Sequence, residues 1–176
     1  MLTMLFVQQS LMLIFLMRDG KANSVVEHFD WLTSALVLKT FRKLFPVILT
    51  DNGSEFKYTL EMERTIDGAN RTKIFYCDPQ ASWQKAHIEK NHEYIRYILP
   101  KKTSFNNLTQ KDCDLIASHI NSTSRIILNN KTPYEAVQTL ISVDIINKLN
   151  IKFINPNQVN LSPNLLKKVY DKNDRK

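Results

Sequence analysis

The first seventeen residues, MLTMLFVQQSLMLIFLM, are so apolar that they have to be buried either in a membrane or in a protein core. A Gln-Gln-Ser triplet at 8–10 interrupts the run, no basic residue precedes it, and Arg18 ends it below the length of a membrane-spanning helix. We therefore expect two buried strands joined by a turn at 8–10. A membrane-anchored protein is the alternative, and it rests on this segment alone.

A helix and a second buried strand are predicted next. SVVE at 24–27 has the spacing of a capping box, and apolar residues continue at helical intervals to Leu36, which predicts a helix over about 24–39. LFPVILT at 44–50 is almost continuously apolar. This pattern predicts a strand that is covered on both faces and delivers Asp51 at its carboxyl end.

The middle of the chain predicts one more strand and a long helix. Residues 57–71 are polar and predict a loop with at most a short helix, whereas TKIFYC at 72–77 predicts a strand. Ser82 can cap a helix that runs to Leu99, because Pro100 stops the helical backbone there.

Two capped helices and a tail complete the chain. Thr109 and Thr132 each precede a helical pattern, the second with proline in the first helical position and glutamate in the third. The Asn- and Lys-rich residues beyond about 155 predict a loosely packed basic tail. The order of elements indicates an α/β fold in which a mixed sheet is flanked by helices.

The net charge of +7 is concentrated in the C-terminal half of the chain. Residues 1–84 carry nine basic and nine acidic side chains, whereas residues 85–176 carry fifteen and eight. A polyanionic partner such as DNA is the natural inference, although a basic surface can also serve solubility alone. Cys77 and Cys113 have no metal-ligand spacing and predict no disulfide, which favours the cytoplasm.

Asp51 is the first candidate for chemistry. A carboxylate at the mouth of a buried strand is rigidly held and meets solvent, which suits a ligand of a divalent metal. Asn52-Gly53 would turn the chain, and Gly53 would let a phosphate approach the backbone closely. Taken alone, an Asp-Asn-Gly segment is more often a simple turn.

The helix predicted over 82–99 carries the second candidate. Ile88, His92, Ile95 and Leu99 mark its expected buried stripe, which leaves Glu89 on an adjacent face where it could point at Asp51. The alternative for Glu89 is a solvated side chain paired with Lys85 four residues earlier.

Basic side chains around Glu89 predict a surface for a nucleic-acid backbone. The candidate DNA contacts on this helix are Lys85, Lys90, His92 and Arg96. Trp83 and Tyr94 could stack on bases, but core packing is the more common role of such rings, and His92 is equally well explained as a core histidine.

Three segments in series resemble the catalytic core of DDE transposases and integrases. VILTDNGSEF (47–56), IFYCDPQASWQKAHIEKNHEYIRYILPK (74–101) and HINSTSRIILNNKTPYEAV (119–137) are similar in order and content to insertion-sequence transposases of the IS30 family. The resemblance covers residues 1–140 and leaves 141–176 as a basic C-terminal extension. Ala86 and His87 depart from it, since relatives often have Gly and Arg there.

The resemblance implies a ribonuclease-H-like fold and a site with two magnesium ions held by Asp, Asp and Glu. Asp51 would be the second aspartate and Glu89 the glutamate of this set. In the family the first aspartate lies on a central strand before the one that MLTMLFV resembles, and no counterpart of it is found in this sequence, nor is the family's DNA-recognition domain. Asp19 and Asp30 cannot replace that aspartate, because Asp19 follows the paired strands and Asp30 lies in the first helix.

Two functions are therefore expected. The first is DNA transposition by metal-dependent phosphoryl transfer, in a core that lacks one ligand and would be inactive alone. The second is a non-catalytic DNA-binding product that regulates transposition by joining a copy of itself or a full-length transposase. Both imply DNA as partner and a place in the bacterial cytoplasm, at the nucleoid.

Overall fold

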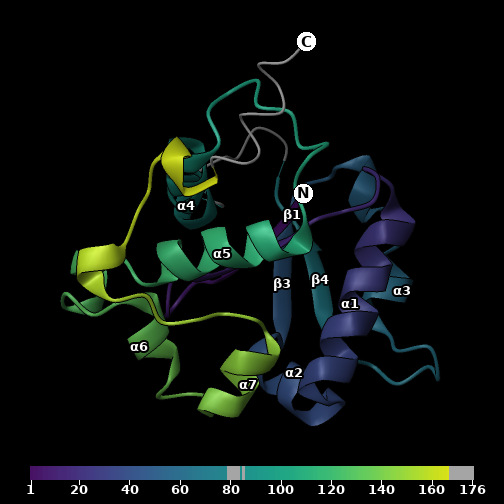
Figure 1. Ribbon diagram of the computed structural model, residues 1–176. Helices are drawn as coiled ribbons and strands as arrows, with labels where there is room; N and C mark the ends of the chain where they lie inside the picture. The colour runs from purple at the N-terminus through teal and green to yellow at the C-terminus, as the bar shows by residue number, and fades with distance from the viewer. Residues whose placement is uncertain (79–83, 85, 167–176) are drawn as a thin grey trace. The chain divides into compact units, whose positions relative to one another are not determined.

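A computed structural model describes residues 1–78, 84 and 86–166 (Figure 1). The chain divides into two compact units. The first unit contains Met1–Leu2 and Met17–Ala86, and the second contains Thr3–Leu16 and His87–Lys176. Each unit has its own core and is described by itself. The predicted division of the chain at residue 140 stays a prediction.

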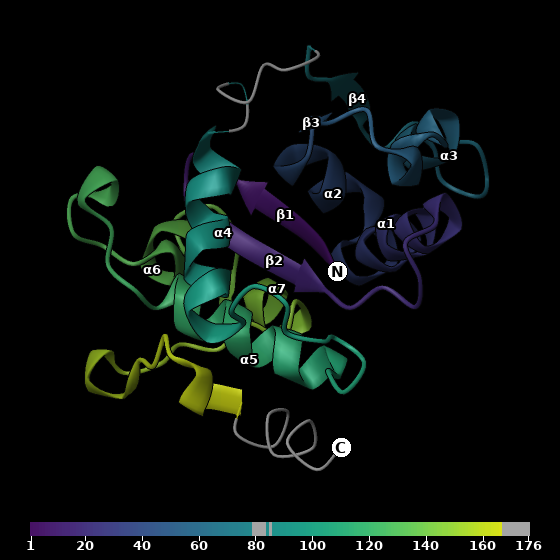
Figure 2. The ribbon, with the colours of Figure 1, turned by 90° about the horizontal axis from the view of Figure 1, so that it is seen from above.

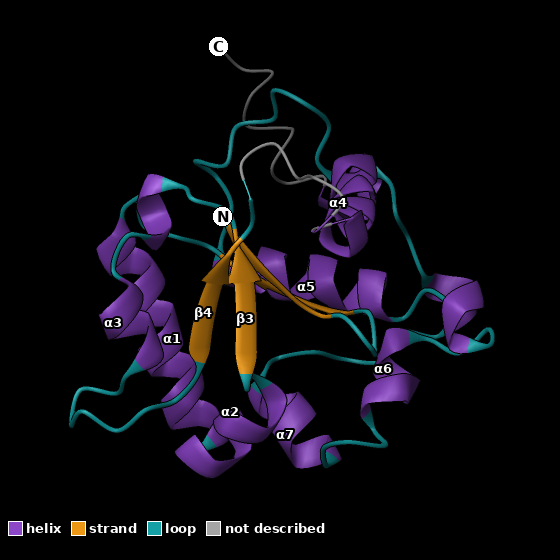
Figure 3. Cartoon of the chain, turned by 180° about the vertical axis from the view of Figure 1, so that it is seen from behind, coloured by secondary structure: helices purple, strands orange, loops and turns teal. Residues whose placement is uncertain are grey.

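The first unit combines a small sheet with helices, as an α/β fold does. Its strands, β3 (Val47–Thr50) and β4 (Lys73–Tyr76), are parallel and pair Val47 with Lys73 and Thr50 with Tyr76 (Figure 3). Its helical elements are α1 (Ala22–Leu36), α2 (Leu38–Leu44), the 3-10 turn η1 (Ser54–Phe56) and α3 (Thr59–Glu63). Helix α1 contacts α2, α3 and η1, and α3 contacts β4.

Helix α1 begins earlier and ends earlier than its sequence pattern suggested. Lys21 is the N-cap and makes no capping bond with its side chain, while the Ser24 hydroxyl donates to Oδ1 of Asp19 at 2.6 Å. The predicted capping box is therefore wrong, because Asp19 attracts the hydroxyl that would have capped the helix. At the other end, Val37 has a φ of 62°, a left-handed conformation that separates α1 from α2.

The prediction that β3 is covered on both faces is wrong. Val47 is 56% exposed and Leu49 is 46% exposed, and Phe75 of β4 shares their face. Among the described residues, β3 pairs with β4 alone, so this sheet has only two strands. A continuous apolar run predicts that both faces of a strand are buried. It does not ensure that other elements of the chain pack on both faces.

A buried arginine holds the first unit together. The side chain of Arg71 donates to Oδ1 of Asp30 at 2.6 Å and to Oγ1 of Thr33 at 3.1 Å, both on α1. Its other nitrogens donate to the backbone carbonyls of Met62 and Glu61 in α3. One guanidinium thus connects two helices, with its charge balanced by a carboxylate.

The second unit is built on a hairpin and helices. The strands β1 (Leu2–Phe6) and β2 (Leu11–Phe15) form a two-stranded sheet and run in opposite directions (Figure 2). The helical elements are α4 (Ala86–Ile98), α5 (Gln110–Asn121), η3 (Ile126–Leu128), α6 (Pro133–Val137), α7 (Val143–Lys148), η4 (Pro156–Gln158) and η5 (Pro163–Leu166). The predicted pair of buried strands with a turn between them is confirmed.

Side chains of α5 close the edge of β2 that β1 leaves open. The Asn121 amide accepts from Met12 N at 2.8 Å and donates to Met12 O at 2.7 Å. The Gln110 amide accepts from Leu16 N and donates to Ile14 O in the same way. Two amides thus take the place of a neighbouring strand, and β2 is buried throughout its length.

The predicted helix starts at Thr109 and Thr132 are confirmed. Thr109 forms a complete capping box with Asp112, and Thr132 forms one with Glu135. Pro133 stands in the first turn of α6, where its missing N–H costs nothing.

The segment after α7 is bonded to α5, and within the predicted loose tail this holds for Asn160, while Leu166 is buried. The prediction of a loosely packed tail is thus corrected at these two residues. The hydroxyls of Ser118 and Ser122 accept from the backbone N–H groups of Lys152 and Ile154, and Nδ1 of His119 accepts from Asn160 N at 3.0 Å. The side chains provide these acceptors at intervals along α5. Residues 167–176 lie outside the described part of the chain.

Cys77 is half-buried and Cys113 is buried, and both are free thiols. Burial raises the pKa of Cys113 to about 12, so this thiol stays protonated. In the described residues there is no helix whose length and apolar character would let it cross a membrane.

Candidate functional site

Asp51 follows the last residue of β3 and is exposed to solvent. Gly53 N points to its Oδ1 at 3.4 Å, a distance at which the hydrogen bond is weak. The strand fixes the backbone while the carboxylate remains accessible. Asp51 therefore lies where the sequence placed it, at the carboxyl end of a strand.

Glu55 is a second carboxylate in the same loop, and sequence reasoning missed it. A β-carbon placed on Gly53 would lie 2.5 Å from Oε2 of Glu55 and 3.1 Å from Oδ1 of Asp51. The backbone of Gly53 has an ordinary φ of −66°, and a side chain here would displace the Glu55 carboxylate from its position beside Asp51. The motif TDNGSEF thus gathers two carboxylates around one glycine.

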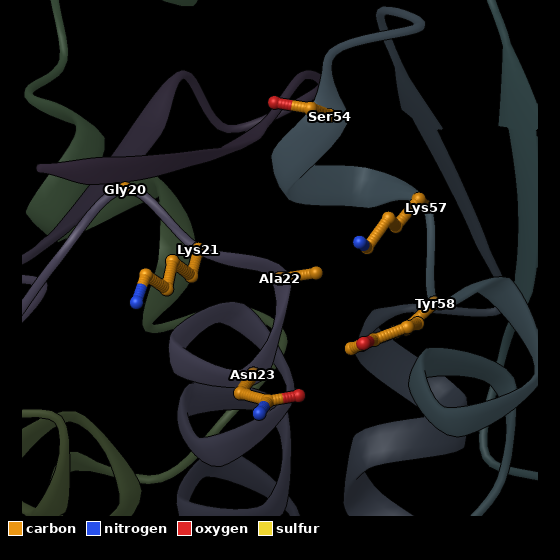
Figure 4. A pocket seen from close by; sticks show the side chains of 7 residues that line it. All are labelled: Gly20, Lys21, Ala22, Asn23, Ser54, Lys57 and Tyr58. Atoms are coloured by element: carbon orange, nitrogen blue, oxygen red, sulfur yellow. The ribbon is translucent and has the colours of Figure 1, made fainter.

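An open pocket of about 200 Å³ lies beside this loop (Figure 4). Ser54, Lys57 and Tyr58 come from the loop, and Gly20, Lys21, Ala22 and Asn23 from the start of α1. In Figure 4, Lys57 and Tyr58 extend toward the beginning of α1, while the Lys21 ammonium points away from them. The ammonium of Lys57 lies 5.1 Å from the centre of the Tyr58 ring. The lining is partly polar and partly apolar and includes no carboxylate, and its two halves are too distant in sequence to be predicted together.

Glu89 lies in the first turn of α4 and is exposed. A carboxylate is favourable there, because the helix N-terminus carries partial positive charge. Its predicted partner Lys85 lies outside the described residues, as do Ser82 and Trp83. The pairing of Glu89 with Lys85 stays a prediction.

The buried face of α4 differs from the predicted stripe. Asn91, Ile95 and Ile98 are its buried residues, and Ile88 and His92 are only half-buried. The apolar periodicity excluded Asn91 because it is polar, but its Nδ2 donates to the backbone carbonyl of His87 at 2.9 Å. A local hydrogen bond of this kind lets a polar residue take a core position.

The other candidate DNA contacts on α4 have different environments. Lys90 pairs with Glu93 at 2.7 Å, and that hydrogen bond raises the pKa of the Lys90 ammonium. Nε2 of His92 lies 2.7 Å from Oγ1 of Thr3 in β1, which favours the core-histidine interpretation. Arg96 is exposed.

The two candidate carboxylates belong to different units, Asp51 to the first and Glu89 to the second. Within the described residues there is no group of three His, Cys, Asp or Glu side chains placed to hold a metal ion. Asp19 and Asp30 bond to residues of their own unit, Asp19 to Ser24 and Asp30 to Arg71.

Comparison with known proteins gives relatives by sequence. The transposase InsI of insertion sequence element IS30A from Escherichia coli is 33% identical over 93 residues, which are 48% of this chain and 24% of that protein. The transposase of IS1086 from Cupriavidus metallidurans is 26% identical over 130 residues, 74% of this chain and 36% of that protein. A putative integrase, ORF3, of Spiroplasma virus SpV1-R8A2 B is 35% identical over 82 residues, which are 47% of this chain and 24% of that protein.

The matched region thus spans about a quarter to a third of the length of these relatives. No family model matches the chain. No solved structure matches it either. Transposases of different insertion sequence elements match the chain. The chain is therefore a homologue of insertion-sequence transposases, that of IS30 among them.

Proposed function

We propose that this chain carries part of a DNA strand-transfer core of the DDE type, with Asp51 and Glu89 as two of its acidic residues. The observation that supports it most is the exposed carboxylate of Asp51 at the end of a parallel strand, in a chain related to transposases. A ribonuclease-H-like fold is part of the proposal. The hairpin, the helix α1 and the parallel pair β3–β4 follow one another in the order expected of such a fold after its first strand, which this sequence lacks.

Magnesium is the metal that this chemistry would use. Carboxylate oxygens are the ligands it prefers, and Asp51 and Glu89 each fit as one donor. The described residues do not supply a complete set of three, so we assign these two side chains as ligands and propose no closed site. When bound, such ions make a water or a DNA 3′-hydroxyl a stronger nucleophile and offset charge on the phosphate.

The protein's own residues would perform three tasks. The rigid end of β3 would keep the Asp51 carboxylate in place, so that little order is lost when a ligand binds. Gly53 would keep the space between Asp51 and Glu55 free of a side chain. The exposed Arg96 would contact the phosphate backbone on α4.

A nicking assay on supercoiled plasmid DNA with Mg²⁺ or Mn²⁺ tests the proposal. The chain lacks one expected ligand, so nicking by the original chain is the first thing that the assay measures. Where nicking occurs, Asp51→Asn and Glu89→Gln should each abolish it, because an amide is a far poorer ligand than a carboxylate. Asp67→Asn and Asp144→Asn are controls, each an exposed acid on the same unit as its counterpart, and should keep full activity. Activity that survives both Asp51→Asn and Glu89→Gln would contradict the assignment.

A second candidate function is a DNA-binding regulator without catalysis. The incomplete acidic set within the described residues and the basic C-terminal half favour it. This function predicts salt-sensitive binding to duplex DNA, no nicking with either metal, and inhibition of a full-length transposase through mixed assemblies. Nicking that depends on Asp51 would rule it out.

A further inference from the structure

The loop between α5 and α6 presents two isoleucines to solvent. Ile126 is 90% exposed and Ile127 is 70% exposed, in the short turn η3. In Figures 1 and 2 the green segment that contains this turn extends at the periphery of its unit. Adjacent apolar side chains with this exposure cost free energy in water unless they bind something.

Backbone hydrogen bonds around Arg125 close the loop at its base. Arg125 N donates to Lys131 O at 2.9 Å, and Arg125 O accepts from Leu128 N and Asn130 N, both at 3.0 Å. Asn129 has a φ of 55° and Asn130 a φ of 62°, the left-handed conformation that asparagine tolerates better than most residues. Unusual backbone geometry thus holds the two isoleucines outward.

Arg125 ties the base of the loop to α4. Its guanidinium lies 4.0 Å from the centre of the Tyr94 ring, and Nη2 donates to Ile120 O. Tyr94 is five residues after Glu89, so about 7.5 Å of helix separates them. The tip is therefore anchored to the same helix that carries the proposed catalytic glutamate.

The surroundings of the tip are basic and hydrogen-bonding. Residues 122–134 contain Arg125 and Lys131 but no Asp or Glu, and the exposed Asn129 and Asn130 adjoin the isoleucines. The nearest acid in sequence, Glu135, is engaged in its capping box. Lys131 is exposed, whereas Arg125 is buried at the base of the loop. An apolar tip whose own segment presents a lysine and two amides and contains no acid complements a nucleic acid better than an apolar protein surface.

We propose that Ile126 and Ile127 form a wedge that inserts between base steps of duplex DNA. Apolar wedges of this kind unstack a step and kink the duplex, which brings more of its backbone onto the protein. Lys131 and the two asparagines would contact phosphates and base edges beside the opened step. The inference rests on the proposed DNA function and adds to it a contact that distorts the DNA.

A short duplex with 2-aminopurine beside a TA step tests the wedge, because such steps open easily and the fluorescence of the probe rises when it is unstacked. The full chain should bind and raise the fluorescence. A double variant, Ile126→Ser with Ile127→Ser, should bind about tenfold more weakly and give no rise. Its salt dependence should stay unchanged, since no phosphate contact is removed.

Two further variants control the experiment. Ile66 is 92% exposed on a loop of the first unit, so Ile66→Ser should leave both affinity and fluorescence unchanged. Leucine at 126 and 127 keeps the apolar tip and should restore the signal, which separates insertion from a folding defect.

Three results would overturn the wedge. The double serine variant could raise the fluorescence as strongly as the original chain, or the original chain could bind DNA without any rise. In a third case the serine variant would abolish self-association while leaving DNA binding intact, which would make the tip a contact between copies. Each of these leaves the proposed function standing, whereas a complete absence of salt-sensitive DNA binding would remove both.

Discussion

Among the described residues, each unit of this protein contains one buried arginine, and the two differ in how their charge is compensated. Arg71 is 1% exposed and every nitrogen of its guanidinium donates a hydrogen bond, one of them to the carboxylate of Asp30. Arg125 is 8% exposed, rests on the Tyr94 ring and donates to one carbonyl through Nη2. Within the described residues, its Nη1 has no hydrogen-bond partner.

The two arginines differ in the compensation of their positive charge. Arg71 is paired with a carboxylate, whereas the contacts of Arg125 with described residues include none. Burial lowers the pKa of both guanidinium groups, but Asp30 counteracts this for Arg71 through a hydrogen bond. Arg125 has a ring in place of an acid, and a ring compensates a buried cation only in part. Positive charge at the base of the 125–131 loop is consistent with a negatively charged partner outside it.

The largest effect should follow the removal of Arg71. Arg71→Met deletes four hydrogen bonds and leaves Asp30 without its ion partner, so we expect unfolding to become easier by about 3 kcal/mol or more. Urea unfolding followed by circular dichroism measures this. A loss below about 1 kcal/mol would show that α1 and α3 do not depend on the arginine.

Replacing Arg125 should cost less. Arg125→Met removes the ring contact and one hydrogen bond, but it also removes a charge whose burial is unfavourable, so a loss of about 1–2 kcal/mol is expected. Urea unfolding of this variant and of the Arg71 variant, measured side by side, shows which substitution lowers the free energy of unfolding more. If Arg125→Met proved the more damaging, the guanidinium would have to be better compensated than its contacts indicate.

The Tyr94 ring should account for much of what Arg125 contributes. Tyr94→Leu keeps apolar volume but removes the cation–π contact, and we expect a loss of about 1 kcal/mol. In the double variant with Arg125→Met the two losses should not add, because they remove the same contact. Full additivity in this double-mutant cycle would show that the ring and the guanidinium act independently.

Acid should weaken the two units in different pH ranges. Burial lowers the pKa of His119, so the unfolded chain binds a proton more readily, and the stability that neutral His119 provides is lost as the pH falls below about 6.5. Hydrogen bonds from Ile74 N and Lys73 lower the pKa of Glu63, whose contribution is present above about 4.5 and lost below it.

Amide hydrogen exchange at pH 7 and pH 5.5 can test this order. After correction for the slower intrinsic exchange at lower pH, exchange near Asn160, whose N–H donates to His119, should be accelerated at pH 5.5, while that near Ile74 should stay equally protected. His119→Gln should remove the pH dependence at Asn160. Equal acceleration in both units would contradict the assignment of the transition to His119.

Local signals in the sequence predicted the elements well. The Gln-Gln-Ser turn, the capping residues Thr109 and Thr132 and the stop at Pro100 each determine the backbone through contacts a few residues away. The failures depended on distant groups. Ser24 donates to Asp19 and does not cap its helix. Val47 and Leu49 are exposed because no element among the described residues packs on their face. His119 accepts a hydrogen bond from Asn160, in a segment that was expected to be loosely packed.

The candidate site divides in the same way. The position of Asp51 at the end of a strand could be predicted, because an apolar run and a turn define it locally. The approach of Glu55 to Gly53 could not, since it depends on the path of the loop. Likewise, an aliphatic pattern does not reveal that Ile126 and Ile127 point outward, because isoleucine is ordinarily assigned to the core.

The closed edge of β2 has a consequence for the chemical ageing of the protein. Hydrolysis of the Asn121 side-chain amide would leave a carboxylate, which can still accept from Met12 N but has no hydrogen to donate to Met12 O. The exchange of one functional group at a fully buried position would therefore create an unsatisfied carbonyl and a place for a foreign strand to attach. Of the two amides that close this edge, Gln110 would then be the one left to bond the backbone of β2 in both directions.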